Sequence, residues 1–162
     1  KFNSANGQYN LAVTYINMEK LADAKKALES CEKDADWNNA MGVIALREND
    51  LKDAAKYFAA SGNATSKENA AIINILDGDY KAAAEKLAGV KSANAVLVQL
   101  LLGNNAPAAE FACKCPLAAY LRAVAAARQG NAEGVKKNLE DAKKCEKLAA
   151  RAEKDIEFAQ YK

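Results

Sequence analysis

The sequence of 162 residues contains no histidine. This absence excludes Ser-His-Asp and Cys-His catalysis and every metal site that depends on an imidazole ligand. The chain also lacks a Gly-x-x-x-x-Gly-Lys loop, the signature of a phosphate-binding turn. Its carboxylates are many, but no two are singled out as a catalytic pair. We therefore expect a protein that is not an enzyme and that carries no cofactor and no metal ion.

Long apolar runs are missing as well. The longest lies around residues 95–102 and is interrupted by Gln99. A membrane-spanning helix needs about 20 consecutive apolar residues, so we expect no transmembrane span and no signal peptide in this segment. The first residue is Lys1 rather than methionine. From this we expect a processed product or an excised part of a longer protein.

Proline and glycine are scarce, with two and eight copies, and alanine is abundant. This composition favours helices throughout. The 23 basic and 21 acidic residues are interleaved along the chain and leave a net charge of only +2. Interleaved charges are typical of solvated helix faces, whereas nucleic-acid binding needs a concentrated basic stripe, so we expect no nucleic-acid partner.

What the sequence does contain is a repeat. In its first copy Leu21 is followed by Ala24 and then by the larger Leu28, and the same spacing of small and large apolar residues recurs. The five copies cover residues 21–31, 51–61, 80–90, 105–115 and 132–142. A repeat of this length indicates stacked helix pairs, each of which contacts mainly its neighbours.

A turn precedes the second helix of every copy. The residue that ends the first helix is Glu19, Asn49, Gly78, Gly103 or Gly130, and the next is Lys20, Asp50, Asp79, Asn104 or Asn131. Glycine and asparagine readily adopt the left-handed conformation that terminates a helix. The aspartate or asparagine that follows can cap the next helix. The turns therefore support the same register as the apolar pattern.

These patterns predict an all-α fold, an α-α superhelix (solenoid) of about five helix-turn-helix repeats in a single domain over residues 1–162. The expected repeats are 5–33, 36–62, 67–90, 92–115 and 117–142. A closing helix is expected over residues 144–160, with Leu148, Ala152, Ile156 and Ala159 as its buried stripe.

The residues resemble the tetratricopeptide repeat family. The resemblance rests on the pairs Leu11 with Ala12 and Met41 with Gly42, on Tyr15, and on the Ala-x-x-x-Leu/Phe steps of the second helices. It covers roughly residues 5–142, with repeats shorter than the family's period of about 34 residues. The resemblance implies a stack whose first helices line a concave groove that holds a segment of another protein.

By this resemblance, an apolar trough with polar ends should face the groove. The candidate partner-binding residues are Tyr9, Asn17, Asn39, Arg47, Glu68, Tyr120 and Arg128. An apolar or amphipathic peptide would suit such a surface. Two alternatives stay open at this point: the aliphatic side chains pack between the helices, or the closing helix covers them.

The four cysteines are Cys31, Cys113, Cys115 and Cys145. Cys31 and Cys115 occupy equivalent repeat positions, which favours a role as small buried hydrophobic residues. Cys113-x-Cys115 is the one spacing that suits a soft-metal or redox site, but it is not the spacing of a zinc ribbon. A disulfide that joins Cys145 to Cys113 or Cys115 is the other open alternative.

Two hypotheses of function follow. The first is a non-enzymatic scaffold that binds a protein or peptide on the concave face of the stack. The alternative is a structural spacer or assembly domain of a larger bacterial cell-envelope protein. The second hypothesis places the chain in the periplasm or at the outer membrane, with the cytoplasm as the alternative compartment.

Overall fold

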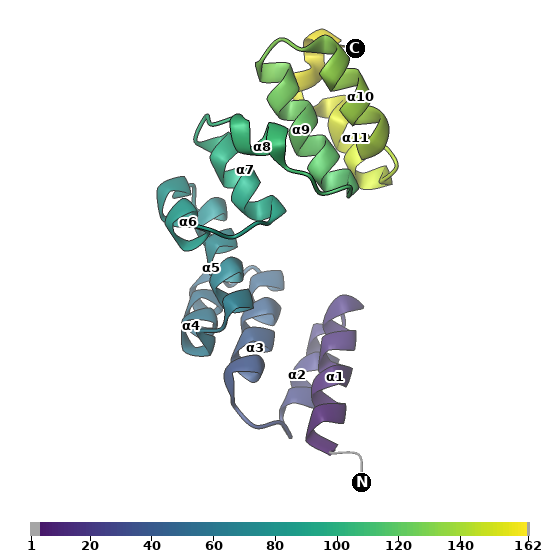
Figure 1. The fold of residues 1–162 in the computed structure, drawn as a ribbon. Helices are drawn as coiled ribbons and strands as arrows, with labels where there is room; N and C mark the ends of the chain where they lie inside the picture. Colours follow the sequence, from purple (N-terminus) through teal and green to yellow (C-terminus); the bar gives the residue numbers. More distant parts are fainter. Residues whose placement is uncertain (1–3, 162) are drawn as a thin grey trace. The chain divides into compact units, whose positions relative to one another are not determined.

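A computed structural model describes residues 4–161, with side chains from residue 7 onward. The two ends of the predicted domain range, residues 1–3 and 162, lie outside the described residues. The described chain is helical throughout and contains no strand (Figure 1). Its α-helices are α1 Ser4–Asn17, α2 Leu21–Leu28, α3 Ala35–Arg47, α4 Leu51–Ser61, α5 Ala64–Leu76, α6 Tyr80–Lys86, α7 Ala93–Leu101, α8 Ala106–Glu110, α9 Pro116–Arg128, α10 Ala132–Ala142 and α11 Glu146–Lys154. A 3-10 helix, η1 Ile156–Tyr161, ends the described part.

The helices pack as consecutive pairs. Contacts join α1 with α2, α3 with α4, α5 with α6, α7 with α8, and α9 with α10. The first helices of neighbouring pairs also touch, α1 with α3 and α3 with α5, and further along the chain α7 with α9. The all-α class and the helix-turn-helix pairs agree with the sequence-based prediction, while the superhelix stays a prediction. Contacts divide the chain into two compact units, residues 1–86 (unit 1) and residues 87–162 (unit 2).

The five predicted turns adopt one backbone geometry. Their first residues all have positive φ, from 60° at Glu19 and 63° at Asn49 to 86° at Gly103. In every turn the next residue donates its N–H to the carbonyl five residues earlier, as Asp50 does to Ala45 over 2.8 Å. These are the bonds of a Schellman helix end. The predicted positions of the turns are confirmed, and Glu19 adopts the left-handed conformation although it is neither glycine nor asparagine.

The predicted caps form in three of the five turns. The side chains of Asp50, Asp79 and Asn131 each accept a hydrogen bond from the backbone N–H three residues later. Lys20 has no side-chain acceptor and makes no such bond. In the fourth turn the N-cap is Asn105 instead of the predicted Asn104, and Asn105 makes no such bond either. The second helices therefore begin at Leu21, Leu51, Tyr80, Ala106 and Ala132, within one residue of prediction.

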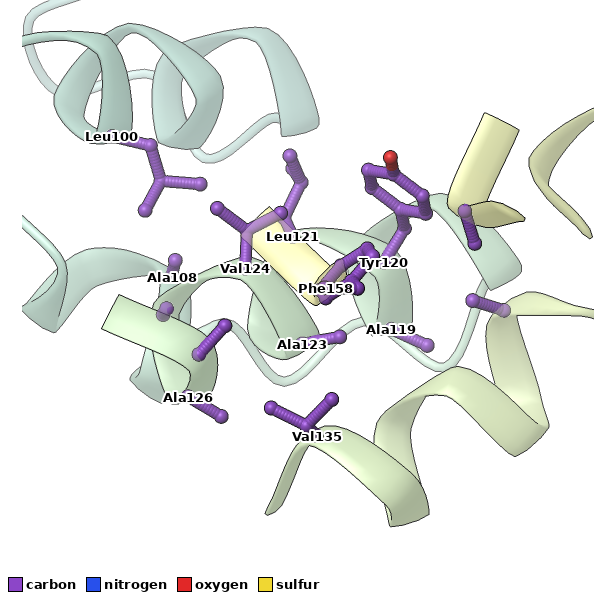
Figure 2. Packing of buried hydrophobic residues seen from close by; sticks show 14 of the residues in the cluster. Leu100, Ala108, Ala119, Tyr120, Leu121, Ala123, Val124, Ala126, Val135 and Phe158 are labelled. Carbon is purple, nitrogen blue, oxygen red and sulfur yellow. The ribbon is translucent and has the colours of Figure 1, made fainter. Parts of the chain in front are cut away.

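Unit 2 is organised around α9, whose side chains from Ala118 to Ala127 are almost all buried. Small alanines on this helix let α10 approach closely. Larger side chains, among them Tyr120, Leu121 and Phe158, fill the remaining space (Figure 2). In unit 1 the same close approach is made at Gly42, where an added Cβ would lie 2.5 Å from the ring of Phe58.

The second helix of the fourth repeat is shorter than predicted. The repeat register predicts helix over residues 105–115, but α8 ends at Glu110 and residues 111–115 are non-helical. Arg122 on α9 explains the early end, because its Nη1 donates to the carbonyls of Phe111 (2.6 Å) and Cys113 (2.9 Å). These side-chain donors satisfy carbonyls that a longer helix would satisfy internally.

The closing helix also differs from prediction. The chain leaves the helix at Asp155, whose ψ of 125° is extended, and continues as η1. The Asp155 carboxylate accepts hydrogen bonds from the hydroxyl of Tyr120 and from the backbone N–H of Glu157, two residues later. The break rotates the predicted stripe, so that Ile156 is 86% exposed and Phe158 is buried in its place.

Candidate functional site

Counted back from the five turns, the first helices present equivalent side chains in rows. In unit 1 a polar row comes first (Tyr9, Asn39 and Glu68), and aliphatic rows follow (Val13, Val43 and Ile72; Ile16, Leu46 and Ile75). A final row consists of Asn17, Arg47 and Leu76. Because α1 contacts α3 and α3 contacts α5, each row runs across three neighbouring helices. The five predicted groove residues that belong to unit 1 therefore lie on three helices, of which α3 contacts both α1 and α5.

The aliphatic rows are only partly covered. Five of these side chains are half-buried, and we call them the aliphatic strip: Val13, Val43, Leu46, Ile72 and Ile75. Ile16 is buried, whereas Leu76 at the end of α5 is 60% exposed. Partly exposed aliphatic side chains on adjacent helices are more informative than the same residues scattered singly. This strip is the principal candidate surface of unit 1.

The two ends of the strip differ in charge. At one end Arg47 is exposed and lies 3.8 Å from a carboxylate oxygen of Glu19, an ion pair at the surface. At the other end the pKa of Tyr9 is raised, first by burial and then by the negative charges of Asp36 and Asp34. An anionic group on a ligand is therefore favoured beside Arg47 and disfavoured beside Tyr9.

The side chain of Asn39 joins α3 to α5. Its Oδ1 accepts from the hydroxyl of Ser66 (2.9 Å) and from the amide of Asn69 (3.1 Å), both on α5. A carbonyl oxygen has two lone pairs, so this acceptor is fully used. Ser66 is completely buried. Only the amide N–H groups of Asn39 can therefore serve a ligand.

In unit 2 Tyr120 is buried and does not face an open groove, and Arg128 is exposed but pairs with residues of the chain itself. Tyr120 is 4% exposed, donates its hydroxyl to Asp155, and packs edge-on against Phe158. Burial, and after it the hydrogen bond and charge of Asp155, raise the pKa of Tyr120 to about 12. Arg128 binds the Glu157 carboxylate over 2.6 Å and the carbonyl of Leu100 over 2.6 Å. Both side chains hold the C-terminal segment of the chain.

A pocket of about 250 Å³ persists beside these two residues. Leu97, Leu101 and Val124 form part of its wall, and Arg128 and Arg151 contribute its charge. Sequence reasoning missed the acidic residues that close it, Asp155 and Glu157. Their signal was the alternation of charged and apolar residues after Lys154, which departs from the helical spacing of residues 144–154.

A second hollow, about 570 Å³, lies in unit 1 where α4, α5 and α6 meet. Phe58, Ala70 and Ile73 contribute its apolar lining, and Lys86 on its edge donates to Asn74 over 2.7 Å. Sequence reasoning missed this hollow too. The signal was the row of small residues on one face of α4, at Ala55, Ala59 and Gly62.

The cysteines lie in unlike environments. Cys31 is half-buried, and its thiol donates to the carbonyl of Ala27 over 3.6 Å. Cys113 is exposed and Cys115 half-buried on the non-helical residues 111–115. The interpretation of Cys115 as a small buried residue of the repeat is therefore wrong, and Cys31 is only partly buried. The thiols of Cys113, Cys115 and Cys145 are free, so the alternative of a disulfide to Cys145 is not realised in this structure.

Within residues 4–161 no three cysteine or acidic side chains gather closely enough to hold a metal ion. Among the same residues no helix has the length and apolar character needed to cross a membrane. Comparison of the chain with known protein families, with curated proteins and with solved structures gave no match. The likeness to tetratricopeptide repeats accordingly stays a resemblance of pattern.

Proposed function

We propose that this chain is a non-enzymatic helical-repeat module that binds an extended segment of another protein along the aliphatic strip of unit 1. The observation that carries the proposal is the strip itself: five half-buried aliphatic side chains on three adjacent helices, with unlike charge at its two ends. The ligand would have small apolar side chains along its length and a carboxylate beside Arg47.

Arg47 is able to exchange partners. Its ion pair with Glu19 is long, at 3.8 Å, and the Glu19 side chain is 84% exposed. Exposed pairs of this kind contribute only about 0–1 kcal/mol, so a ligand carboxylate can replace Glu19 at little cost. The equivalent residue of the fifth repeat, Arg128, binds a carboxylate of the chain itself, that of Glu157.

The expected affinity is modest. Complete burial of one aliphatic side chain stabilises a complex by about 1.5–3 kcal/mol, and these five are already partly covered. Association costs an estimated 4–15 kcal/mol of lost freedom. The strip therefore supports dissociation constants in the micromolar range or weaker, with additional hydrogen bonds from Asn17 and from the Asn39 amide.

A random peptide library displayed on phage is the probe that tests this proposal. We expect selected peptides to share apolar residues and at least one carboxylate, and to bind with micromolar affinity in calorimetry. Val43→Asp places a charge in the middle of the strip and should abolish binding. Arg47→Glu should weaken the acidic peptides by about tenfold, because a favourable charge pair becomes a repulsive one.

Lys52→Glu is the matched control, since it makes the same change of charge at an exposed position on α4, a second helix, outside the aliphatic strip. Peptides that bind the Val43→Asp variant as well as the original protein would contradict the proposal, as would a library that yields no shared sequence. Either result would favour the alternative hypothesis, a spacer or assembly role in a larger protein.

A further inference from the structure

Residues 111–115 carry two thiols on a short non-helical segment that leads into α9. Pro116 is the first residue of that helix, and Cys115 is its N-cap with extended backbone angles of −77° and 153°. Proline favours the first helical position because it has no N–H to satisfy, and it restricts the preceding residue to extended conformations. The Cys115 side chain is thereby fixed at the start of a 13-residue helix.

The two thiols touch. The Cys113 thiol donates to the Cys115 sulfur over 2.8 Å, and the backbone N–H of Cys115 donates back to the Cys113 sulfur over 3.4 Å. Arg122 holds the segment in place, since its Nη1 donates to the carbonyls of Phe111 and Cys113. Its Nε donates to Asn138 on α10 over 3.1 Å, which holds the guanidinium in place. The contact is thus built by three elements and does not depend on the loop alone.

The environment of Cys115 also favours a thiolate. Its pKa is lowered, first by the hydrogen bond from the Cys113 thiol and then by the backbone N–H of Ala118, with a smaller contribution from Leu117. Free N–H groups at the start of a helix stabilise negative charge. In thiol–disulfide exchange the nucleophile is the thiolate, not the thiol. A cysteine at the start of a helix, where the thiolate is stabilised, is therefore suited to the attacking role.

We propose that Cys113 and Cys115 form a redox-active dithiol that exchanges with disulfides of other molecules. The Cys115 thiolate attacks one sulfur of the incoming disulfide, RS–SR′, forming a mixed disulfide with R and releasing R′S⁻, which takes up a proton. The Cys113 thiol then loses its proton and attacks the Cys115 sulfur, which expels RS⁻, and RS⁻ is protonated in turn. Overall, the dithiol is oxidised to one internal disulfide, and RS–SR′ is reduced to two thiols.

Arg122 is a positioning residue in this scheme. It touches neither sulfur, but it fixes the carbonyls of Phe111 and Cys113 and with them the separation of the thiols. The second step is intramolecular, and its rate depends on that separation. Loss of the Arg122 contacts should therefore slow closure of the internal disulfide more than it slows the first attack.

Glutathione disulfide is the first probe. A background variant with Cys31→Ala and Cys145→Ala leaves only the pair, and a far-ultraviolet circular dichroism spectrum checks its fold. The protein is incubated with glutathione disulfide, quenched with acid, alkylated and weighed intact. We expect the internal disulfide, two hydrogens lighter than the dithiol, as the main product. Addition of Cys113→Ser should stop the reaction at a glutathione adduct on Cys115.

Addition of Cys115→Ser should slow adduct formation at least about tenfold relative to Cys113→Ser, since the more acidic thiol is lost. Arg122→Met removes the donors to both carbonyls and to Asn138, and it should shift the product from internal disulfide toward the adduct. A disulfide-bonded model peptide, used in parallel, shows whether protein disulfides react as glutathione does. Mixed adducts as the main product of the intact pair, or equal rates for the two serine variants, would overturn the proposal.

Discussion

Replacement of Phe158 by alanine tests how the C-terminal segment is held to unit 2. Phe158 is 1% exposed, and its ring lies edge-on to Tyr120 with centroids 5.6 Å apart. Removal of a buried phenylalanine ring costs about 3–5 kcal/mol, partly through lost burial and partly through the cavity that remains. Since η1 is a terminal segment that can detach as the cavity forms, we expect the lower figure, about 3 kcal/mol.

Ile156→Ala is the matched control on the same segment. Ile156 is 86% exposed and its truncation should change stability by less than about 0.5 kcal/mol. Urea unfolding followed by circular dichroism gives the free energies. Hydrogen exchange gives their location: in Phe158→Ala the amides of α11 and η1 should lose protection before those of α9.

The opposite ranking would refute this reasoning. The helical periodicity of residues 144–160 assigns Ile156 to the core and leaves Phe158 outside it. A large loss for Ile156→Ala with a small loss for Phe158→Ala would mean that α11 continues through Asp155 without the break. The hydrogen bond between Tyr120 and Asp155 would then have no structural role.

Two further predictions concern single groups. Folding raises the pKa of Tyr120 from 10.0 to about 12. The contribution of the protonated hydroxyl to the free energy of unfolding is therefore complete below pH 10 and is lost as the pH rises through 12. When the free energy of unfolding is measured against pH in alkaline solution, Tyr120→Phe should remove this part of the pH dependence. Gly42→Ala places a methyl group 2.5 Å from the Phe58 ring and should destabilise unit 1 by about 1–3 kcal/mol in thermal unfolding. Gly7→Ala, with no atom within 4 Å of the new Cβ, should stabilise by about 0.5–1 kcal/mol, and equal effects of the two changes would contradict the packing argument.

The turns could be predicted from sequence because their determinants are local. Gly78, Gly103 and Gly130 supply positive φ at no steric cost, and the helix ends they form need only backbone bonds within six residues. Asn49 is another residue type that tolerates positive φ, whereas at Glu19 only the repeat register indicated the turn. All-α architecture follows from the same short-range information.

The end of α8 and the end of α11 could not be predicted because distant side chains decide them. Arg122 satisfies two carbonyls upstream of its own helix, and Tyr120 binds Asp155 across 35 positions of sequence. The apolar periodicity continues past both points, at Ala112 and at Ile156. Apolar periodicity reports only the local sequence, so it cannot predict a helix end that depends on a hydrogen bond from a side chain of another helix.

The same limitation explains the cysteines. Register places Cys115 where the first repeat has Cys31, and equal register predicts equal burial. Once α8 ends early, the equivalence ceases to hold, and Cys115 becomes the N-cap of α9 beside the exposed Cys113. The repeat register therefore predicted a wrong environment for Cys115, because Arg122 binds two carbonyls of residues 111–115.

The repeat register nevertheless relates the two ends of the described chain in a way that bears on the ligand. Tyr9 and Arg47 in unit 1 correspond to Tyr120 and Arg128 in unit 2, and the latter two bind carboxylates of the chain's own C-terminal segment, Asp155 and Glu157. In unit 1 the pKa of Tyr9 is raised, first by burial and then by the negative charges of Asp36 and Asp34, which oppose an anion there, whereas Arg47 pairs with the exposed Glu19 over 3.8 Å. One carboxylate beside Arg47, rather than two, is thus the anionic group that the charges of unit 1 favour in a bound segment.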